Sequence, residues 1–354
     1  MERPRVVRSR GVEKSDIGSS GFFGSSLKKS EGTLVDRFIV PPFSVFDTKQ
    51  GYWQKRKKEW ISLGINSGKG RGEMNPGSVG DNRHDPAATY QKKKKMGNVP
   101  INKIFSRDGG AGGDPSQTGT SIFDPVVCEI SYRWFCPQNG RILDPFAGGS
   151  VRGIVAGYLG YDYAGIDLRK EQVEANYQQA EDILTKEHGV VDWRVGNSLD
   201  LSEICKGEKF DFIFSCPPYF NLEVYSDHDE DLSAISWEQF QEQYSTIIKN
   251  SVDLLNDDSF ACFVISNIRD SKGYMRDLVY ETTKAFEDAG ALLYNEAILA
   301  TSIGSLPIRI TAQFNAGRKL GRSHQNILYF CKGDIKKAVA KLTKSLWDFF
   351  TLQM

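Results

Sequence analysis

The chain lacks the long apolar runs and the paired cysteines that would assign it to a membrane protein or to a disulfide-stabilised protein. No stretch approaches the roughly 18 uncharged apolar residues that a membrane span needs, and the first ten residues, MERPRVVRSR, lack the apolar segment of a secretory signal. The six cysteines are scattered and form no C-x-x-C pair, so we expect neither a zinc site nor a disulfide framework. These absences predict a soluble, cytoplasmic protein.

Charge is unevenly distributed, although the chain is neutral as a whole. Residues 1–110 hold 22 Lys and Arg against 11 Asp and Glu, whereas the remaining residues hold 23 against 34. A basic extension on an acidic body suits a polyanionic partner. The alternative is an extension that folds against the body through charge complementarity.

Composition divides the 354 residues into four segments. Residues 1–37 are a basic tail rich in Ser, Gly and Arg, in which no ordered core is expected. Residues 38–117 form a basic and aromatic extension. In it the stretch 51–65 predicts a short helix with tryptophans on one side and cations on the other, followed by a Gly-, Ser- and Lys-rich loop. Residues 118–335 form the main domain, and 336–354 a C-terminal helix.

Strand and helix signals alternate through the main domain. This pattern predicts an α/β fold with a doubly wound, mostly parallel, seven-stranded sheet. Strands are expected at 141–146, 162–168, 193–198, 210–219, 260–268, 291–301 and 326–333. Helices are expected at 121–135, 150–160, 169–184, 237–255 and 277–290.

Three successive strand ends carry groups suited to a nucleoside ligand. Asp144 opens the small-residue turn DPFAGGS, where backbone can approach a ligand closely. Asp167 follows 23 residues later, close to the spacing at which an acidic side chain accepts hydrogen bonds from ribose hydroxyls. Asn197 offers an amide to an adenine edge. The chain has no G-x-x-x-x-G-K-[ST] loop, which argues against ATP hydrolysis, and its glycine turn is not G-x-G-x-x-G.

The fourth strand end carries the diproline loop Ser215-Cys216-Pro217-Pro218-Tyr219. Two prolines remove N–H donors and stiffen the loop, so a carbonyl group and an aromatic face would be held at fixed positions. On its own, such a loop is also compatible with a simple turn that packs a tyrosine.

Together, four motifs resemble the series found in the amino-methylating DNA methyltransferases: DPFAGGS (144–150), GIDL (165–168), GNS (196–198) and SCPPY (215–219). The resemblance covers about residues 118–333 and implies a Rossmann-like methyltransferase fold. It implies S-adenosylmethionine as cofactor, and methyl transfer to N4 of cytosine or N6 of adenine. The cofactor-binding residues it implies are Ser121, Phe123, Asp124, Asp144, Pro145, Phe146, Gly148, Gly149, Asp167, Leu168, Asn197 and Ser198.

In the same resemblance, the catalytic residues are Ser215, Cys216, Pro217, Pro218 and Tyr219. The residue before Pro-Pro and the carbonyl of Pro217 would accept hydrogen bonds from the target amine, while Tyr219 would stack on a base swung out of the duplex. This sequence departs from the family pattern at Cys216, where Asp, Asn or Ser is usual and where sulfur is a weak acceptor. Ser215 is the alternative acceptor. The serine-containing loop favours cytosine N4 over adenine N6.

The resemblance also implies double-stranded DNA as partner, with a restriction endonuclease as a further partner, and a phage or prophage protein acting in the bacterial cytoplasm. The DNA-binding candidates are Lys55, Arg56, Lys57, Lys58, Arg309, Arg318, Lys319 and Arg322. Two alternatives remain open. One is an RNA or protein methyltransferase, and the other is a catalytically inactive DNA-binding module with the same fold.

Overall fold

The computed structural model describes residues 33–65, 123–219, 235–270, 272–301, 303 and 306–342. The chain divides into two compact units, residues 1–42 and 43–354. In the first unit, the described residues form α1 (Leu34–Phe38), which begins at a capping box between Thr33 and Asp36. The predictions for residues 1–32, for the loop between 66 and 117 and for 343–354 lie outside the described residues.

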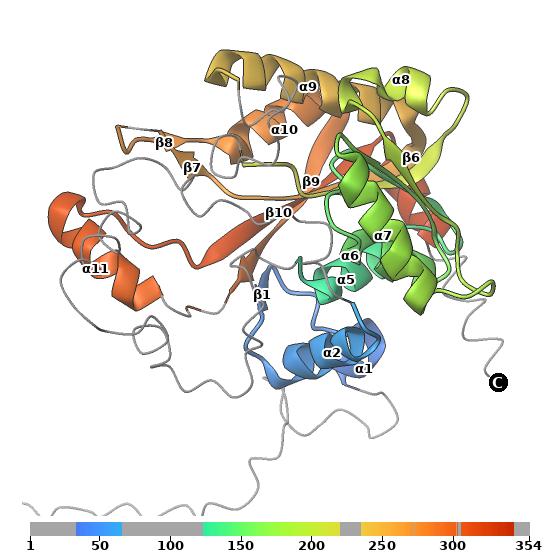
Figure 1. Cartoon of the computed structure of the whole chain (residues 1–354), viewed down its shortest axis with the longest axis horizontal. Helices are drawn as coiled ribbons and strands as arrows, with labels where there is room; N and C mark the ends of the chain where they lie inside the picture. The colour runs from blue at the N-terminus through green and yellow to red at the C-terminus, as the bar shows by residue number, and fades with distance from the viewer. Residues whose placement is uncertain are drawn as a thin grey trace, which may run out of the picture. The chain divides into compact units, whose positions relative to one another are not determined.

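The second unit is built on an eight-stranded sheet (Figure 1). Of the strands that the structure describes, only β10 runs antiparallel to its neighbours in this sheet. Across the sheet the order is β1 (Val45–Asp47), β9 (Ala291–Ala300), β10 (His324–Lys332), β6 (Leu255–Ile265), β5 (Phe210–Ser215), β2 (Arg141–Asp144), β3 (Asp162–Asp167) and β4 (Val191–Val195).

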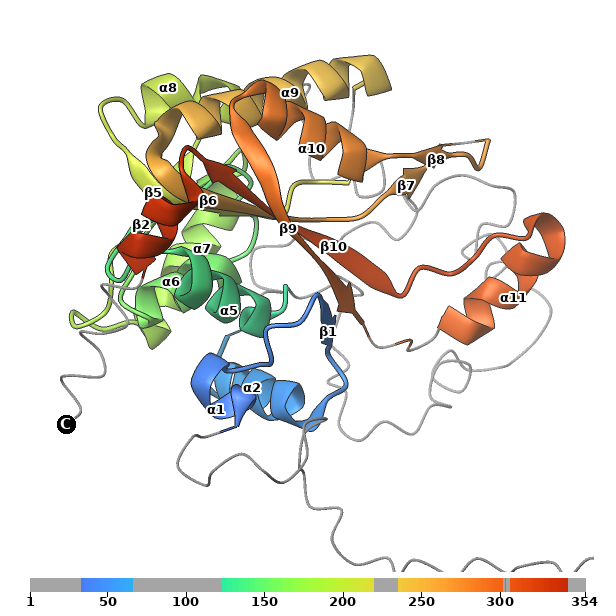
Figure 2. The same cartoon turned by 180° about the vertical axis from the view of Figure 1, so that it is seen from behind.

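Helices cover both faces of the sheet, as Figures 1 and 2 show. One face carries α5 (Pro125–Phe135), α6 (Val151–Tyr158) and α7 (Lys170–Ile183). The other carries α8 (Leu201–Ile204), α9 (Trp237–Leu254) and α10 (Leu278–Asp288). Strands covered on both sides are apolar throughout rather than alternating, which explains the run FDFIF in β5. The predicted fold class, a doubly wound and mostly parallel α/β sheet, is confirmed.

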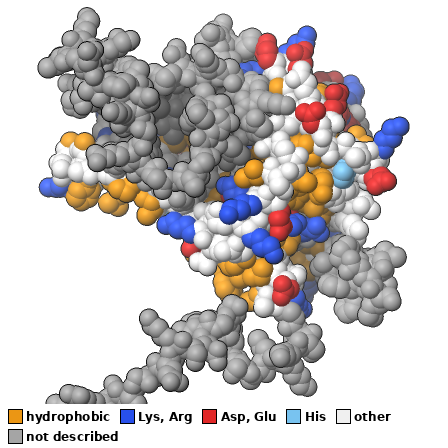
Figure 3. Space-filling model, turned by 60° about the horizontal axis from the view of Figure 1, so that its bottom comes forward, with side chains coloured by type: hydrophobic (Ala, Val, Ile, Leu, Met, Phe, Trp, Pro, Cys, Tyr) orange, Lys and Arg blue, Asp and Glu red, His pale blue; other side chains and the backbone are white. Residues whose placement is uncertain are grey.

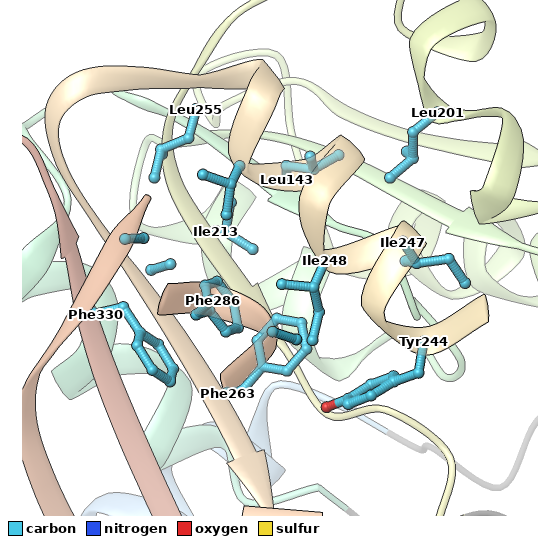
Figure 4. Packing of buried hydrophobic residues seen from close by; sticks show 14 of the residues in the cluster. Leu143, Leu201, Ile213, Tyr244, Ile247, Ile248, Leu255, Phe263, Phe286 and Phe330 are labelled. Atoms are coloured by element: carbon cyan, nitrogen blue, oxygen red, sulfur yellow. The ribbon is translucent and has the colours of Figure 1, made fainter. Parts of the chain in front are cut away.

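The core between the sheet and the α9–α10 layer combines aliphatic and aromatic side chains (Figure 4). Phe286 of α10 stacks on Phe330 of β10 with ring centroids 4.0 Å apart, and its edge meets Phe263 of β6 at 5.0 Å. All three side chains are fully buried. Each such burial stabilises the fold by about 2 kcal/mol, so these contacts hold α10 against β6 and β10.

The structure adds elements that the sequence analysis did not anticipate. The predicted seven strands are present between residues 141 and 332, and β1 makes an eighth by pairing parallel to β9. A separate hairpin is formed by β7 (Ile268–Arg269) and β8 (Met275–Arg276), and α11 (Leu306–Gly317) precedes β10. The helix expected within 51–65 is α2 (Gly51–Ser62), and residues 335–342 are helical.

A helix that spans a membrane must be both long and apolar. None of the helices in the described part of the chain has the length and apolarity needed to cross a bilayer.

Candidate active site

The strand order reverses between β2 and β5. From β2 the chain proceeds to β3 and β4 on one side, and then returns to β5 and β6 on the other. In open α/β sheets, ligands bind outside the carboxyl ends of the strands at such a reversal. Asp144 is the last residue of β2 and Ser215 the last of β5, and the Ser215 hydroxyl donates a hydrogen bond of 2.5 Å to Asp144 Oδ1.

Asp144 is fully buried and is surrounded by donors. Its Oδ2 accepts from Arg152 Nε at 2.5 Å and from the Tyr163 hydroxyl at 2.7 Å, and its Oδ1 also accepts from the backbone N–H of Phe146 at 3.1 Å. Burial lowers the pKa of Arg152, but the charge and hydrogen bond of Asp144, together with Tyr163 and Cys216, outweigh this effect, and the net pKa is raised. The Asp144 carboxylate therefore shapes the turn after β2. That Asp144 takes part in cofactor binding stays a prediction.

The glycine turn, residues 145–150, is held from several directions. Arg152 donates to the carbonyls of Phe146 and Ala147. The N–H of Gly148 donates to Asp167 Oδ2 at 2.9 Å, and its carbonyl accepts from Asn176 Nδ2 of α7 at 2.8 Å. Gly148 has a φ of +50°, in the left-handed region that favours glycine. The turn is therefore a preorganised stretch of backbone at the edge of the site.

Asp167 lies at the end of β3, next to this turn. Its carboxylate accepts from the backbone N–H groups of Gly148 and Arg169, each at 2.9 Å. Two carboxylate oxygens offer about four acceptor positions, so capacity remains for hydroxyl donors. Burial raises the pKa of Asp167, and its side chain keeps 13% exposure. Leu168 follows directly and is half-buried.

The segment after β4 is tied to the same turn. The hydroxyl of Ser198 is buried and donates to the carbonyl of Pro145 at 2.5 Å. That Ser198 takes part in cofactor binding stays a prediction. Asn197 is half-buried, and its side-chain oxygen accepts from the N–H of Leu199 at 3.0 Å, which caps the short helix η1 (Ser198–Asp200). Gly149 is buried in the turn.

The diproline loop follows directly from β5. Pro217 is buried, whereas Cys216, Pro218 and Tyr219 are half-buried. The Tyr219 hydroxyl accepts from Gln325 Nε2 of β10 at 2.6 Å and lies 3.8 Å from Cys216 Sγ. The tyrosine is thus fixed at its tip. Gln325 is a site residue that the sequence analysis missed.

The alternative that Ser215 supplies the acceptor for the target amine is corrected by its position. Its side chain is fully buried and its hydroxyl points to Asp144 rather than beyond the sheet edge. In the loop this leaves Cys216 and the carbonyl of Pro217 as the predicted acceptors.

The N-terminus of α5 closes one side of this region. The Phe123 ring meets Phe214 of β5 edge-on at 5.8 Å, and the guanidinium of Arg152 lies 5.0 Å from its centroid. Asp124 caps α5 through the N–H of Val126. Ser121 lies outside the described residues.

Two predicted DNA-binding cations of α2 are instead paired with α5. Arg56 donates to both oxygens of the fully buried Glu129, at 2.6 and 2.5 Å, and Lys57 donates to Asp124 at 3.0 Å. This part of the extension folds against the body by charge complementarity, as in the alternative given for the basic extension. DNA binding by Arg56 and Lys57 stays a prediction. Lys55 and Lys58 are exposed. On the face shown in Figure 3, the described basic and acidic side chains are intermixed.

The other predicted DNA-binding residues lie between α11 and β10 or within α11. Arg318 and Arg322 are exposed, Lys319 is half-buried, and the side chain of Arg309 lies outside the described residues. Arg322 donates to the hydroxyl of Ser266, just after β6, at 3.1 Å. Burial and the charge of Arg269 lower the pKa of Arg322, while the nearby Tyr219 and Asp277 oppose that shift. Arg322 lies three residues before Gln325, which contacts Tyr219 of the diproline loop.

Comparison with known proteins gives the following. No protein-family model and no curated protein sequence matches the chain. Solved structures that match include TrmN from Thermus thermophilus (14% identity, 59% of this chain and 49% of that chain, TM-score 0.40). They also include a putative RNA methyltransferase from Pyrococcus horikoshii (12%, 56% and 76%, 0.35). A third is magnesium protoporphyrin IX methyltransferase from Synechocystis PCC 6803 with bound SAH (11%, 71% and 96%, 0.39). The chain matches about half the length of TrmN.

Proposed function

We propose that the chain is an S-adenosylmethionine-dependent methyltransferase that methylates the exocyclic amino group of a base in DNA. The observation that carries the proposal is the hydrogen-bonded link across three neighbouring strand ends. Ser215 bonds Asp144, and Asp167 bonds the glycine turn that Asp144 and Arg152 shape. This link brings the diproline loop and the candidate nucleoside-binding groups to one edge of the sheet.

The cofactor would be held by groups that this geometry leaves facing the edge. Asp167 has spare acceptor positions for ribose hydroxyls, and the glycine turn allows close approach of backbone. Asn197 is the proposed partner of the adenine edge. Phe123 offers an apolar surface above Arg152. When bound, the cofactor supplies a methyl group on sulfur that is already electrophilic.

Positioning is then the main task of the protein. An exocyclic amine shares its lone pair with the ring, so acceptors that bond its two hydrogens turn the lone pair outward. The Pro217 carbonyl and Cys216 are the proposed acceptors. The amino nitrogen bonds to the methyl carbon, the carbon–sulfur bond breaks, and the nitrogen loses a proton to solvent. Tyr219, fixed by Gln325, is the proposed stacking surface for the flipped base.

DNA is proposed as the substrate and cytosine N4 as the acceptor, with adenine N6 as the alternative. The serine-containing loop and the resemblance of the motif series support this choice. An RNA acceptor is tested alongside DNA, because the same amine chemistry applies to both.

The test is transfer of labelled methyl from S-adenosylmethionine to duplex DNA, to RNA of matched sequence and to protein, with binding of S-adenosylhomocysteine measured by calorimetry. Tyr219→Ala and Pro218→Ala should each lower kcat at least 100-fold while cofactor binding changes less than threefold. Tyr294→Ala is the control, since this tyrosine lies in the first half of β9, away from the carboxyl ends of the parallel strands. Full activity of Tyr219→Ala, or transfer to RNA alone, would contradict the proposal.

A further inference from the structure

Two segments beside the diproline loop carry a concentration of positive charge. We define the hairpin surface as residues 268–276, the β7–β8 hairpin, together with residues 318–322, the segment that leads into β10. With Asp277 included, these segments contain six cations and two carboxylates. The cations are Arg269, Lys272, Arg276, Arg318, Lys319 and Arg322.

The two segments lie against each other. A Cβ placed on Gly273, at the hairpin turn, would come within 3.1 Å of the Lys319 Cε atom. Arg322 lies close enough to Arg269 for their charges to repel, and it also lies near Tyr219. Figures 1 and 2 place the hairpin and the chain between α11 and β10 at the same end of the sheet. The segment that contains Arg322 leads directly to Gln325, which donates to the Tyr219 hydroxyl at 2.6 Å and so links the hairpin surface to the diproline loop.

Three of these guanidinium groups donate hydrogen bonds to neutral acceptors in the described part of the chain. Arg269 donates to the carbonyl of Gly273 at 2.8 Å, Arg318 to the carbonyl of Phe314 at 3.4 Å, and Arg322 to the hydroxyl of Ser266 at 3.1 Å. All three acceptors are neutral. Like charges held together in this way favour a polyanion as the ligand.

The two carboxylates in these segments serve the backbone. Asp270 Oδ1 accepts from the N–H of Tyr274 at 2.8 Å inside the hairpin turn. Asp277 caps α10 by accepting from the N–H of Tyr280 at 3.2 Å. Asp270 thus stabilises the hairpin turn, and Asp277 stabilises the start of the helix that follows the hairpin.

Apolar side chains project from the same surface. Tyr274 is 73% exposed and Leu320 is 77% exposed, while Met275 is 45% exposed. The turn that presents Tyr274 is braced, because the N–H of Asp270 donates to the Tyr274 carbonyl at 2.9 Å and the N–H of Gly273 donates to the Asp270 carbonyl at 3.0 Å. Cations interleaved with exposed aromatic and aliphatic side chains match a ligand with phosphates and stacked bases.

We propose that the hairpin surface binds the duplex DNA substrate next to the target base, with its cations on the phosphates and Tyr274 against the base stack opened when the target leaves it. This inference rests on the proposed function for its choice of DNA. The cations and exposed apolar side chains of the hairpin surface are what indicate a ligand with phosphates and stacked bases. The place of this surface beside Tyr219 sets which part of the substrate it contacts.

The test uses Lys272→Ala/Lys319→Ala and Tyr274→Ala in the full chain. Fluorescence anisotropy with a labelled duplex, measured over a series of salt concentrations, should show a smaller salt slope for the double-lysine variant. Loss of two phosphate contacts corresponds to a change of roughly 1.8 in that slope. Tyr274→Ala should weaken binding roughly tenfold with the salt slope unchanged, since stacking carries no charge. Lys336→Ala/Lys337→Ala, two exposed lysines in the helix 335–342, is the matched control.

Calorimetry with S-adenosylhomocysteine, run on the same variants, separates the two proposals. If the wild-type protein neither binds S-adenosylhomocysteine nor transfers methyl groups, the proposed function is contradicted. In that case the anisotropy series still tests DNA binding by the hairpin surface. Unchanged duplex binding in both hairpin variants, an equal loss in the Lys336/Lys337 control, or losses with single-stranded RNA only would overturn the inference. Urea unfolding of each variant checks that the fold is retained.

Discussion

The Asp144 side chain decides the shape of the turn after β2. Four donors surround its carboxylate, and two of them, Arg152 and Tyr163, come from α6 and β3. Arg152 continues the network to the carbonyls of Phe146 and Ala147. Asp144 therefore affects the candidate cofactor site indirectly, by positioning the backbone of the turn after β2.

Arg152→Met is expected to leave the buried Asp144 carboxylate without its cation. Removing one partner of a buried ion pair costs about 3–5 kcal/mol in the free energy of unfolding, which urea denaturation measures. The double variant Arg152→Met/Asp144→Asn should recover a large part of that loss. Equal destabilisation by single and double variants would contradict the role assigned to the pair.

Cys216 occupies the position where a stronger acceptor is expected for amine methylation. Replacing its sulfur by oxygen in Cys216→Ser provides a better acceptor at nearly the same size. On the proposed mechanism, kcat should rise several-fold, with the affinity for S-adenosylhomocysteine unchanged. A fall in kcat would show that the thiol does not stand in for an acceptor oxygen.

The helix α2 docks on α5 through the buried carboxylate of Glu129. This group accepts hydrogen bonds from Arg56 and from the indole of Trp60, the latter at 2.7 Å, while Arg133 of α5 lies 3.2 Å away. The same pair of helices is joined by Trp53 and Lys57, which both donate to Asp124. The N-terminal extension therefore supports the helix that begins beside Phe123.

Glu129→Gln keeps the shape of this group but removes its charge. We expect a loss of about 2 kcal/mol in the free energy of unfolding, because charge-assisted hydrogen bonds are stronger than neutral ones. Glu59→Gln is the control. It breaks the exposed pair of Arg56 with Glu59 and should cost less than about 0.5 kcal/mol. Similar losses in both variants would argue against docking through Glu129.

A second ion-pair group joins the starts of β2 and β5 to β4. Glu208 accepts from Arg194 at 2.6 Å and from Arg141 at 2.6 Å, and these hydrogen bonds lower the pKa of Glu208 to about 2. Because the pKa of Glu208 is lower in the folded than in the unfolded state, its charged form stabilises the folded protein at pH values above the usual glutamate pKa of 4.5. That contribution is lost as the pH falls from about 4.5 towards 2.

Glu208→Gln should therefore destabilise the protein by about 1 kcal/mol at pH 7. The difference from wild type should shrink as the pH falls below 4.5. Urea unfolding at a series of pH values measures this difference. A difference that does not change with pH would contradict the assignment.

Local patterns predict most of the main domain, because its strands are apolar runs and its helices have clear starts such as Asp124. The residues that complete the site were not predicted, since their partners depend on strand order and side-chain direction. Arg152 did leave a signal. It is a lone cation in the apolar helix 150–160, and a charge on a buried helix face needs a partner. The sequence around Gln325 and Asn176 gives no comparable indication of the contacts that these residues make.

At the scale of the whole unit, the strands that local sequence patterns did not predict are very short and form only by pairing with other parts of the chain. The strand β1 has three residues, and its pairing with β9 joins positions about 250 apart in the chain. The β7–β8 hairpin has two residues in each strand, too few for any alternation to be recognised. The strand β1 is an edge strand of the eight-stranded sheet and the hairpin forms a separate two-stranded sheet, whereas β2 and β5, whose ends carry the motifs, lie inside the larger sheet.

Mass spectrometry of nucleosides tests the central claim most directly. DNA from cells that express the chain, and from cells that express Tyr219→Ala, would be digested and compared. Our account predicts N4-methylcytosine, or N6-methyladenine as the alternative, in the first sample and its loss in the second. Neither methylated base, from protein that is folded and binds S-adenosylhomocysteine, would contradict it.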